Sequence, residues 1–379
     1  MAVATVPLGP SKYFLNQLDS LLFEICEELQ LPPYRYNQAD ERYHAVSEVL
    51  EADGSPLSPF RPRIYPQGSM RLGTTVRPIT GPHDLDFVCE LSLSHALVEP
   101  IKLLQALHSH LKQHGTYRDM VSLKKRCVRI TYANEFYMDL LPACQDHDAG
   151  GTCIQVPDRD TRSWKPSDPI GYAKWFKGKS TPAVRKFAAD SAEPLPALQA
   201  VEDKAPLQLS VQLIKRWRDI HYADAPTPAP ISIVLTTLAA DAYRGEGSVS
   251  EAIASILHGI LEAVRAAESS GHRLKVLNPS NILEDLSERW DDDEEAYRGF
   301  KAGIQQLSRR WDALLLAGGN QNAELERLFG EPVKTVLEKR AERLHESRFE
   351  KKLSVTSAGV ISAWAGSVRI PANTFHGSK

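Results

Sequence analysis

The chain has 379 residues, 42% hydrophobic and 25% charged, which is typical of a globular protein with one large or two ordinary domains. Its formal net charge of −3 argues against a general electrostatic attraction to nucleic acid or to an anionic membrane. No stretch approaches the roughly 20 apolar residues of a membrane span, and no signal peptide is recognisable, so we expect a cytoplasmic protein without a membrane partner.

The first predicted elements are two helices. Apolar residues recur at helical spacing over residues 11–30, and a second helical stretch covers residues 37–52 and ends at Asp53-Gly54. Residues 55–63 contain several prolines and predict a loop. We expect both helices to form a spine behind a sheet and to carry no chemistry.

The stretch that follows, residues 65–90, reads YPQGSMRLGTTVRPITGPHDLDFVCE and carries the first candidate site residues. Asp84 and Asp86 lie in an alternating apolar run, so in a strand both carboxylates project from one face. Two carboxylates this close repel each other, and their hard oxygens suit Mg²⁺ or Mn²⁺. Gly68-Ser69 offers a backbone free to approach a ligand, amide donors and a hydroxyl, which a triphosphate requires.

A helix over residues 98–114 is predicted next, followed by two strands over residues 125–132 and 136–141. The second strand carries Asp139 as its only charge, and the hairpin would bring this residue beside the first two carboxylates. The basic cluster Lys124-Lys125-Arg126 is either a solvated strand start or a contact for a ligand phosphate.

Gly-Ser, then D-x-D, then a third Asp on a later strand is the signature of DNA polymerase β-like nucleotidyltransferases. An isolated D-x-D is weak, because a solvated strand edge has the same pattern. The ordered set, with each part in the expected strand or turn, favours a nucleotidyl-transfer site.

Residues 142–206 are rich in Pro, Gly, Asp and Ser, and we expect an irregular crossing with one short helix over 170–177. Tyr172, Trp175 and Phe176 could stack on a base, although aromatic residues at this spacing are more often core. The five cysteines show neither a C-x-x-C pair nor a zinc pattern, which predicts reduced, mostly buried thiols.

The last part of the chain is predicted to be helical, with an extended connector over residues 275–279. The acidic run 291–295 sits at a helix start, where negative charge complements the dipole, so a metal site there is disfavoured. The tail lacks a helical period, and we expect it to extend from the globule. The predicted helices cover residues 206–222, 230–243, 248–269, 290–317 and 323–352.

Several stretches together resemble the bacterial cGAS/DncV-like nucleotidyltransferases, the CD-NTases. The resemblance covers most of the chain, and the downstream stretches narrow the match to this family. These are PQGSMRLGTTVRP, DLDFVCE, YMDLLPA, QVPDRDTRSW, SDPIGYAKWF, LQLSVQLIKRWRDIHY, PISIVLTTLAADAY and LNPSNILEDLSERW.

The resemblance implies an α+β fold with a mixed-sheet nucleotidyltransferase core over residues 1–205, a helical lobe over 206–353 and a flexible tail over 354–379. It implies a cleft enzyme that joins and cyclises ATP, GTP or other NTPs into cyclic di- or trinucleotide messengers for CBASS anti-phage defence, releasing pyrophosphate. Two Mg²⁺ or Mn²⁺ ions are implied on a catalytic triad, and a separate group of residues would bind the triphosphate. The triad is Asp84, Asp86 and Asp139, and the triphosphate residues are Gln67, Gly68, Ser69, Lys215 and Ser232.

The terminal VRIPANTFHG resembles tails that are ligated to a target by CBASS conjugation proteins, although Ser378 and Lys379 follow Gly377 here. Two rival functions stay open. A nucleotidyltransferase that modifies RNA or tRNA would use the same carboxylates but should need a basic channel, which the net charge does not indicate. A catalytically inactive scaffold is disfavoured because the triad is intact.

Overall fold

The computed structural model describes residues 12–133, 135–180, 196, 199–316, 321–350, 354–355, 361–362 and 368–369. The chain divides into two compact units, residues 1–319 and residues 320–379, and each is described by itself.

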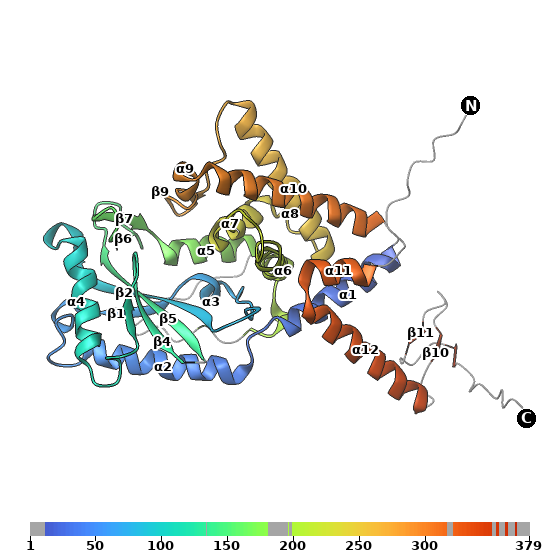
Figure 1. Cartoon of the computed structure of the whole chain (residues 1–379), viewed down its shortest axis with the longest axis horizontal. Coiled ribbons are helices and arrows are strands. Elements are labelled where there is room, and N and C mark those ends of the chain that lie inside the picture. The colour runs from blue at the N-terminus through green and yellow to red at the C-terminus, as the bar shows by residue number, and fades with distance from the viewer. Residues whose placement is uncertain are drawn as a thin grey trace, which may run out of the picture. The chain divides into compact units, whose positions relative to one another are not determined.

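A mixed sheet forms the centre of the first unit (Figure 1). Its strand order is β1-β2-β5-β4-β3, with β2 and β5 parallel and the other neighbours antiparallel. An antiparallel hairpin, β6 with β7, continues from the end of β5. The strands are β1 (Arg63–Pro66), β2 (His83–Ser94), β3 (Val121–Leu123), β4 (Val128–Tyr132), β5 (Phe136–Gln145), β6 (Ile154–Asp158) and β7 (Ser163–Ser167).

One face of this sheet is covered by α2 (Pro33–Glu51) and α4 (Pro100–Gln113) (Figure 1). Every second residue of β2, β4 and β5 points into this core, as the strand period requires. The residues of these three strands in the core are Leu85, Phe87, Cys89 and Leu91 on β2, Val128, Ile130 and Tyr132 on β4, and Phe136, Met138, Leu140 and Cys144 on β5. The intervening side chains, including the predicted catalytic carboxylates, therefore belong to the opposite face.

The two N-terminal helices have different places in the fold. The prediction that both lie behind the sheet is right for α2, whose Tyr43 stacks on Phe87 at 4.8 Å between ring centroids. It is wrong for α1 (Lys12–Glu28), which packs against α6 (Pro206–His221) and α8 (Val249–Ser269). Asp19 accepts hydrogen bonds from the backbone N–H and the hydroxyl of Ser250, at 2.7 and 3.0 Å.

The β6–β7 hairpin corrects the prediction of an irregular crossing after residue 142. β5 runs on to Gln145, and β6 and β7 pair over five residues each, although each contains a proline. These strands lie at the margin of the sheet, where a missing backbone N–H is tolerated. The predicted short helix is present as α5 (Pro169–Ser180), with Tyr172 and Phe176 buried, which confirms the core interpretation for these two aromatic residues.

Most of the remaining described residues of the first unit are helical (Figure 1). The stretch predicted as one helix over 290–317 is divided at Asp293, whose carboxylate accepts a hydrogen bond from the N–H of Ala296 and so caps the second helix. The predicted connector near residue 277 is the first strand of a small hairpin. The elements are α6 (Pro206–His221), α7 (Ser232–Ala242), α8 (Val249–Ser269), β8 (Leu277–Asn278), β9 (Asn281–Asp285), α9 (Arg289–Asp292) and α10 (Glu294–Leu316), with short 3₁₀ turns at Ser58–Phe60, His95–Leu97 and Val201–Asp203.

The second unit contains α11 (Gln321–Phe329) and α12 (Glu331–Phe349), where the sequence predicted one continuous helix. Gly330 separates them with a φ of 74°. Three short antiparallel strands follow, β10 (Ser354–Val355), β11 (Ile361–Ser362) and β12 (Val368–Arg369). The terminal residues considered for conjugation, Gly377, Ser378 and Lys379, lie outside the described residues. In the described part of the chain, no helix is both long and apolar enough to cross a membrane.

Candidate functional site

The three predicted catalytic carboxylates come together on the face of the sheet opposite α2 and α4. Asp84 and Asp86 are two residues apart on β2, and Asp139 lies directly opposite Asp86 on the parallel neighbour β5. The side chain of Asp84 is 57% exposed and that of Asp139 is 15% exposed. Strand alternation and parallel register thus place the three carboxylates in one group, as the sequence predicted.

Arg129 joins this group and was missed by the sequence analysis. It lies on β4 opposite Asp139, and its guanidinium forms two hydrogen bonds to that carboxylate, Nε to Oδ1 and Nη2 to Oδ2, both at 2.7 Å. The same Nη2 lies 3.0 Å from Oδ1 of Asp84. The available signal was the run Val128-Arg129-Ile130, in which alternation sets one cation on the carboxylate face. The predicted hairpin bounds, with Tyr132 opposite Phe136, already set position 129 opposite Asp139.

The electrostatics of the group reflect its crowding. Burial, followed by the charges of Asp139 and Asp84, raises the pKa of Asp86 to about 7. Burial also raises the pKa of Asp84, with Arg129 opposing this effect and Asp139 adding to it. Three mutually repelling carboxylates therefore require positive charge nearby if all are to be ionised at neutral pH.

The predicted triphosphate turn lies against Asp86. The backbone N–H of Gln67 donates to the carbonyl oxygen of Asp86 at 2.8 Å, which fixes the turn to β2. Gly68, with a φ of 57°, opens the short helix α3 (Gly68–Leu72), and a Cβ at this position would be 3.0 Å from Oδ2 of Asp86. Ser69 accepts a 3.5 Å hydrogen bond from the hydroxyl of Thr75. Position 68 therefore needs a glycine, both for its positive φ and for the close approach of the turn to Asp86.

Helix α6 holds the loop after α3 through a row of polar contacts. Gln208 donates to the carbonyl oxygen of Leu72 at 2.9 Å, and Gln212 donates to that of Thr75 at 2.6 Å. Lys215 continues the row, with Nζ donating to the carbonyl oxygen of Thr74 at 3.0 Å. The predicted phosphate-binding lysine is therefore anchored directly beside the Gly68-Ser69 turn.

Ser232 enters the same region at the first turn of α7. Its hydroxyl accepts a 2.9 Å hydrogen bond from Nη1 of Arg218, which also lies 3.0 Å from a carboxylate oxygen of Asp219. Arg218 follows Lys215 by one turn of α6, so the two cations share one side of the helix. The sequence analysis named Lys215 and Ser232 and missed Arg218, which connects α6 to Ser232.

The residues present can be tested for their fit to a divalent metal. Three carboxylates supply the hard oxygen ligands that Mg²⁺ and Mn²⁺ prefer, and their mutual repulsion favours a cation between them. As the side chains stand, however, no three His, Cys, Asp or Glu side chains within the described ranges are arranged to hold a metal ion. The ligand chemistry fits the metal, and the guanidinium of Arg129 lies on two of the three ligands.

In the basic cluster before β4, Lys124 and Lys125 are exposed, as expected of a solvated strand start, whereas Arg126 forms ion pairs within the fold. Arg126 forms an ion pair with the buried carboxylate of Asp158 on β6, Nε to Oδ2 at 2.8 Å, and a second ion pair with Glu288. Lys165 on β7 reaches the same Glu288 at 3.1 Å, and Lys125 lies 3.7 Å from Asp158. This network ties the β6–β7 hairpin to the segment before α9.

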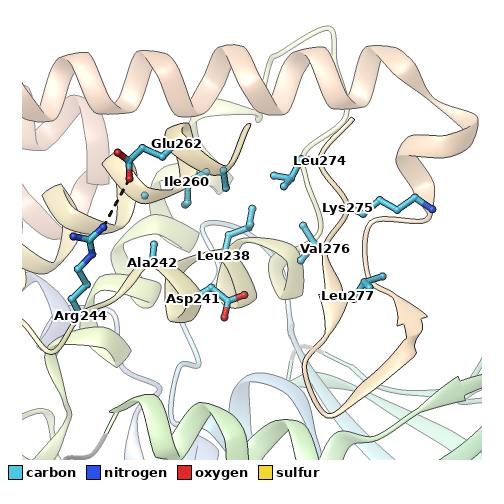
Figure 2. A pocket seen from close by; sticks show the side chains of 12 residues that line it. Leu238, Asp241, Ala242, Arg244, Ile260, Glu262, Leu274, Lys275, Val276 and Leu277 are labelled. Carbon is cyan, nitrogen blue, oxygen red and sulfur yellow. Dashed lines mark ion pairs between the residues drawn. The ribbon is translucent and has the colours of Figure 1, made fainter. Parts of the chain in front are cut away.

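A cavity of about 310 Å³ lies among α7, α8 and residues 274–277 (Figure 2). The ion pair of Arg244 with Glu262, at 3.9 Å, borders it, and Asp241 and Lys275 contribute further charges. None of the predicted site residues lines this cavity.

Comparison with known proteins places these features in context. Residues 17–180 match the Second Messenger Oligonucleotide or Dinucleotide Synthetase (SMODS) domain. A c-di-GMP synthase of Roseivirga ehrenbergii is 31% identical over 373 residues, covering 96% of this chain and 98% of the relative. Cyclic dinucleotide synthase CdnG of Bradyrhizobium diazoefficiens is 28% identical, covering 80% of this chain and 77% of the relative.

Solved structures share the architecture. The CD-NTase CdnG of B. diazoefficiens in complex with GTP superposes with a TM-score of 0.70 at 25% identity, covering 86% of this chain and 99% of that one. The Vibrio cholerae DncV cyclic AMP-GMP synthase, in complex with a linear intermediate, superposes with a TM-score of 0.52 at 16% identity, covering 87% and 94%. The predicted combination of a polymerase β-like core and a helical lobe is confirmed by these likenesses.

Proposed function

The chain belongs to the cGAS/DncV-like nucleotidyltransferases, and from this premise we propose that it joins and cyclises NTPs into a cyclic dinucleotide. The observation that carries the proposal is the approach of the Gly68 turn to Asp86, which itself lies opposite Asp139 on the neighbouring parallel strand. A phosphate-binding turn beside three carboxylates is the arrangement that nucleotidyl transfer requires. The similarity to a c-di-GMP synthase along almost the whole of both chains supports cyclic product formation.

GTP is the substrate we propose first. The Roseivirga relative is a c-di-GMP synthase, and the CdnG structure with a TM-score of 0.70 contains GTP. Two GTP molecules joined and closed into a ring would give cyclic di-GMP. ATP stays a second candidate, because the family resemblance leaves both purine NTPs open.

In this mechanism Asp84, Asp86 and Asp139 would hold two Mg²⁺ or Mn²⁺ ions, which when bound supply charge neutralisation and a lowered pKa for the attacking hydroxyl. In this proposal Asp139 would also accept the proton of that hydroxyl. Lys215 and Ser232 would bind the donor triphosphate together with the backbone around Gly68 and with Ser69 and Gln67.

The reaction is attack by a ribose hydroxyl of the acceptor on the α-phosphorus of the donor. A new phosphorus–oxygen bond forms, the bond between the α- and β-phosphates breaks, and pyrophosphate leaves. The linear dinucleotide retains the acceptor's triphosphate, so after it turns in the cleft a second transfer closes the ring. One set of carboxylates therefore serves both steps.

The biological setting follows from the family and stays a prediction: synthesis of a messenger in the cytoplasm for CBASS anti-phage defence, with conjugation machinery acting on the C-terminal tail.

Radiolabelled GTP and ATP, supplied singly and together with Mg²⁺ or Mn²⁺, test the proposal. We expect a phosphatase-resistant product whose mass is that of a cyclic dinucleotide. The variant Asp84→Ala/Asp86→Ala should form none while remaining folded. Asp53→Ala removes an exposed carboxylate after α2, on the other side of the sheet, and should retain full activity. Turnover by the double variant would contradict the assignment.

The rival function, nucleotide addition to RNA, is tested in the same incubation by adding cellular RNA. Label that enters RNA, rather than a small phosphatase-resistant product, would favour the rival. Label in neither, with every NTP mixture, would count against direct synthesis by the isolated chain. Repeating the incubation with phage lysate then tests whether synthesis requires an activator.

A further inference from the structure

Arg129 is the cation that the structure places on the predicted metal ligands. Its guanidinium uses both oxygens of Asp139 and one oxygen of Asp84, with donor–acceptor distances of 2.7, 2.7 and 3.0 Å. A two-point contact between a guanidinium and a carboxylate is among the strongest pairs that side chains form. Arg129 thus satisfies two of the three carboxylates at once.

The position of this guanidinium is fixed from several sides. Val128 and Ile130, on either side of Arg129 in β4, are fully buried in the core, so the backbone cannot turn to redirect the side chain. The guanidinium carbon also lies 4.5 Å from the centre of the Tyr137 ring, a cation–π contact on the same face of the sheet. Strand pairing, core burial and the aromatic ring together hold Arg129 against the carboxylates.

A divalent ion and this guanidinium need the same ligands. An ion held by Asp139 and Asp84 would use oxygens that already accept hydrogen bonds from Arg129. The divalent ion would also bring its two positive charges close to the positive charge of the Arg129 guanidinium. Binding of the metal and retention of the Arg129 contacts therefore oppose each other, both through shared oxygens and through charge.

We propose that Arg129 is a resident counter-ion of the catalytic carboxylates, and that its side chain must release Asp139 before the triad can hold its metal ions. The inference rests on the proposed function, because it takes Asp84, Asp86 and Asp139 as the metal ligands. In this role Arg129 is a positioning residue: it keeps the repelling carboxylates together in the free protein and sets the strength with which metal is bound.

The test is direct Mn²⁺ binding without nucleotide, measured by calorimetry and by the electron paramagnetic resonance signal of free Mn²⁺. Loss of charge-assisted hydrogen bonds in Arg129→Met should tighten Mn²⁺ binding by about ten- to a hundredfold. Arg129→Lys keeps the positive charge but cannot form the two-point contact, so its Mn²⁺ dissociation constant should lie between those of Arg129→Met and the unmodified protein. The control Arg159→Met removes one exposed positive charge on the loop after β6 and should leave the dissociation constant unchanged.

Thermal unfolding supplies a second measurement that does not depend on activity. In a chelator, Arg129→Met should unfold at a lower temperature than the unmodified protein, because its carboxylates have lost their cation. Saturating Mn²⁺ should raise the unfolding temperature more in the variant than in the unmodified protein. This comparison also reveals whether Arg129→Met is folded, and Arg129→Lys provides the same measurement with a smaller change.

The outcomes separate the two proposals. If Arg129→Met binds Mn²⁺ no more tightly than the unmodified protein, while Asp139→Asn weakens binding, Arg129 does not compete with the metal and this inference is overturned alone. If Asp139→Asn leaves Mn²⁺ binding unchanged, the triad is not the metal site, and both the inference and the metal assignment of the proposed function fail.

Discussion

Asp86 and Asp139 lie directly opposite each other on the parallel strands β2 and β5, and the turn at Gly68 closes over Asp86. The three features come from segments separated by up to about seventy residues, yet the sheet brings them into one group. A substitution at each contact around this group should therefore have a measurable effect on activity, nucleotide binding or stability.

Gly68→Ala should nearly abolish product formation. The new Cβ would be 3.0 Å from Oδ2 of Asp86 in a backbone with a φ of 57°, so either the turn or the carboxylate must move. Because a misplacement of about 1 Å can cost about a hundredfold in rate, a shift of the turn or of Asp86 should lower product formation strongly. The control is Gly81→Ala, which has a φ of 76° and no atom within 4 Å of the added Cβ. Both variants should lose similar stability in urea, and equal activity in the two would contradict the role of the close approach.

The charge of Lys215 predicts a pH dependence of catalysis. Burial, opposed by Asp219, lowers the pKa of Lys215 to about 8. Because a lysine is charged below its pKa, the phosphate-binding charge is present at neutral pH and is lost as the pH rises through about 8. We therefore expect kcat/KM for the NTP to fall above this pH, since this ratio reports ionisations of the free enzyme.

Lys215→Arg provides the control for this profile. An arginine stays protonated over the whole range, so the alkaline fall should move to higher pH or vanish, even if the variant has a lower absolute rate. A parallel fall in the variant and the unmodified enzyme would assign the ionisation to another group.

Arg218 and Ser232 should act as one unit in nucleotide binding. The hydrogen bond between them, at 2.9 Å, joins α6 to the start of α7 beside Lys215. We expect Arg218→Met to weaken GTP binding by about tenfold, and Ser232→Ala to add little in its presence, because coupled neighbours are not additive. Calorimetric titration of the two single variants and the double variant measures the coupling.

The exposed Arg298→Met on α10 is the charge-matched control and should bind GTP normally. Strictly additive losses in the double variant would show that Arg218 and Ser232 act separately.

The ion pair of Arg126 with Asp158 should stabilise the fold rather than the reaction. Asp158 is fully buried, so Arg126→Met would remove its nearest charged partner and leave only the more exposed Lys125, 3.7 Å away. We expect a loss of about 3 kcal/mol in the free energy of unfolding, at the low end for a broken buried pair because Arg126 is partly exposed. Urea unfolding at neutral pH measures it, and Asp158→Asn should restore part of the loss.

Acid provides an internal check on this pair. Burial by itself would raise the pKa of Asp158, but the backbone N–H of Thr161 and then Arg126 lower it to about 2. A carboxylate with a lowered pKa stabilises the fold above its unfolded value and loses this contribution as the pH falls toward the folded value. The difference between Arg126→Met and the unmodified protein should therefore shrink from about pH 4 toward pH 2. A difference that stays constant would mean that lost packing, not charge, causes the destabilisation.

Some features were predictable because they depend on neighbours in the chain. Alternation over residues 84–88 placed both aspartates on one face of a strand, and helical spacing located α1, α4, α6 and α8 to within a few residues. The β6–β7 hairpin was missed because Pro157 and Pro166 weaken a strand pattern, and a marginal strand can tolerate them where a central strand cannot. The division of α10 from α9 was missed because a single capping contact by Asp293 decides it.

Strand alternation and turn chemistry therefore predict the three carboxylates, the glycine turn and the face of the sheet that carries them, and the short connection between β4 and β5 sets Arg129 opposite Asp139. The other partners of these groups are fixed only in three dimensions, because the packing of α6 sets Lys215 beside the turn and Arg218 against Ser232. The packing of a helix against a loop is fixed by contacts between segments far apart in the chain, and no local pattern records it.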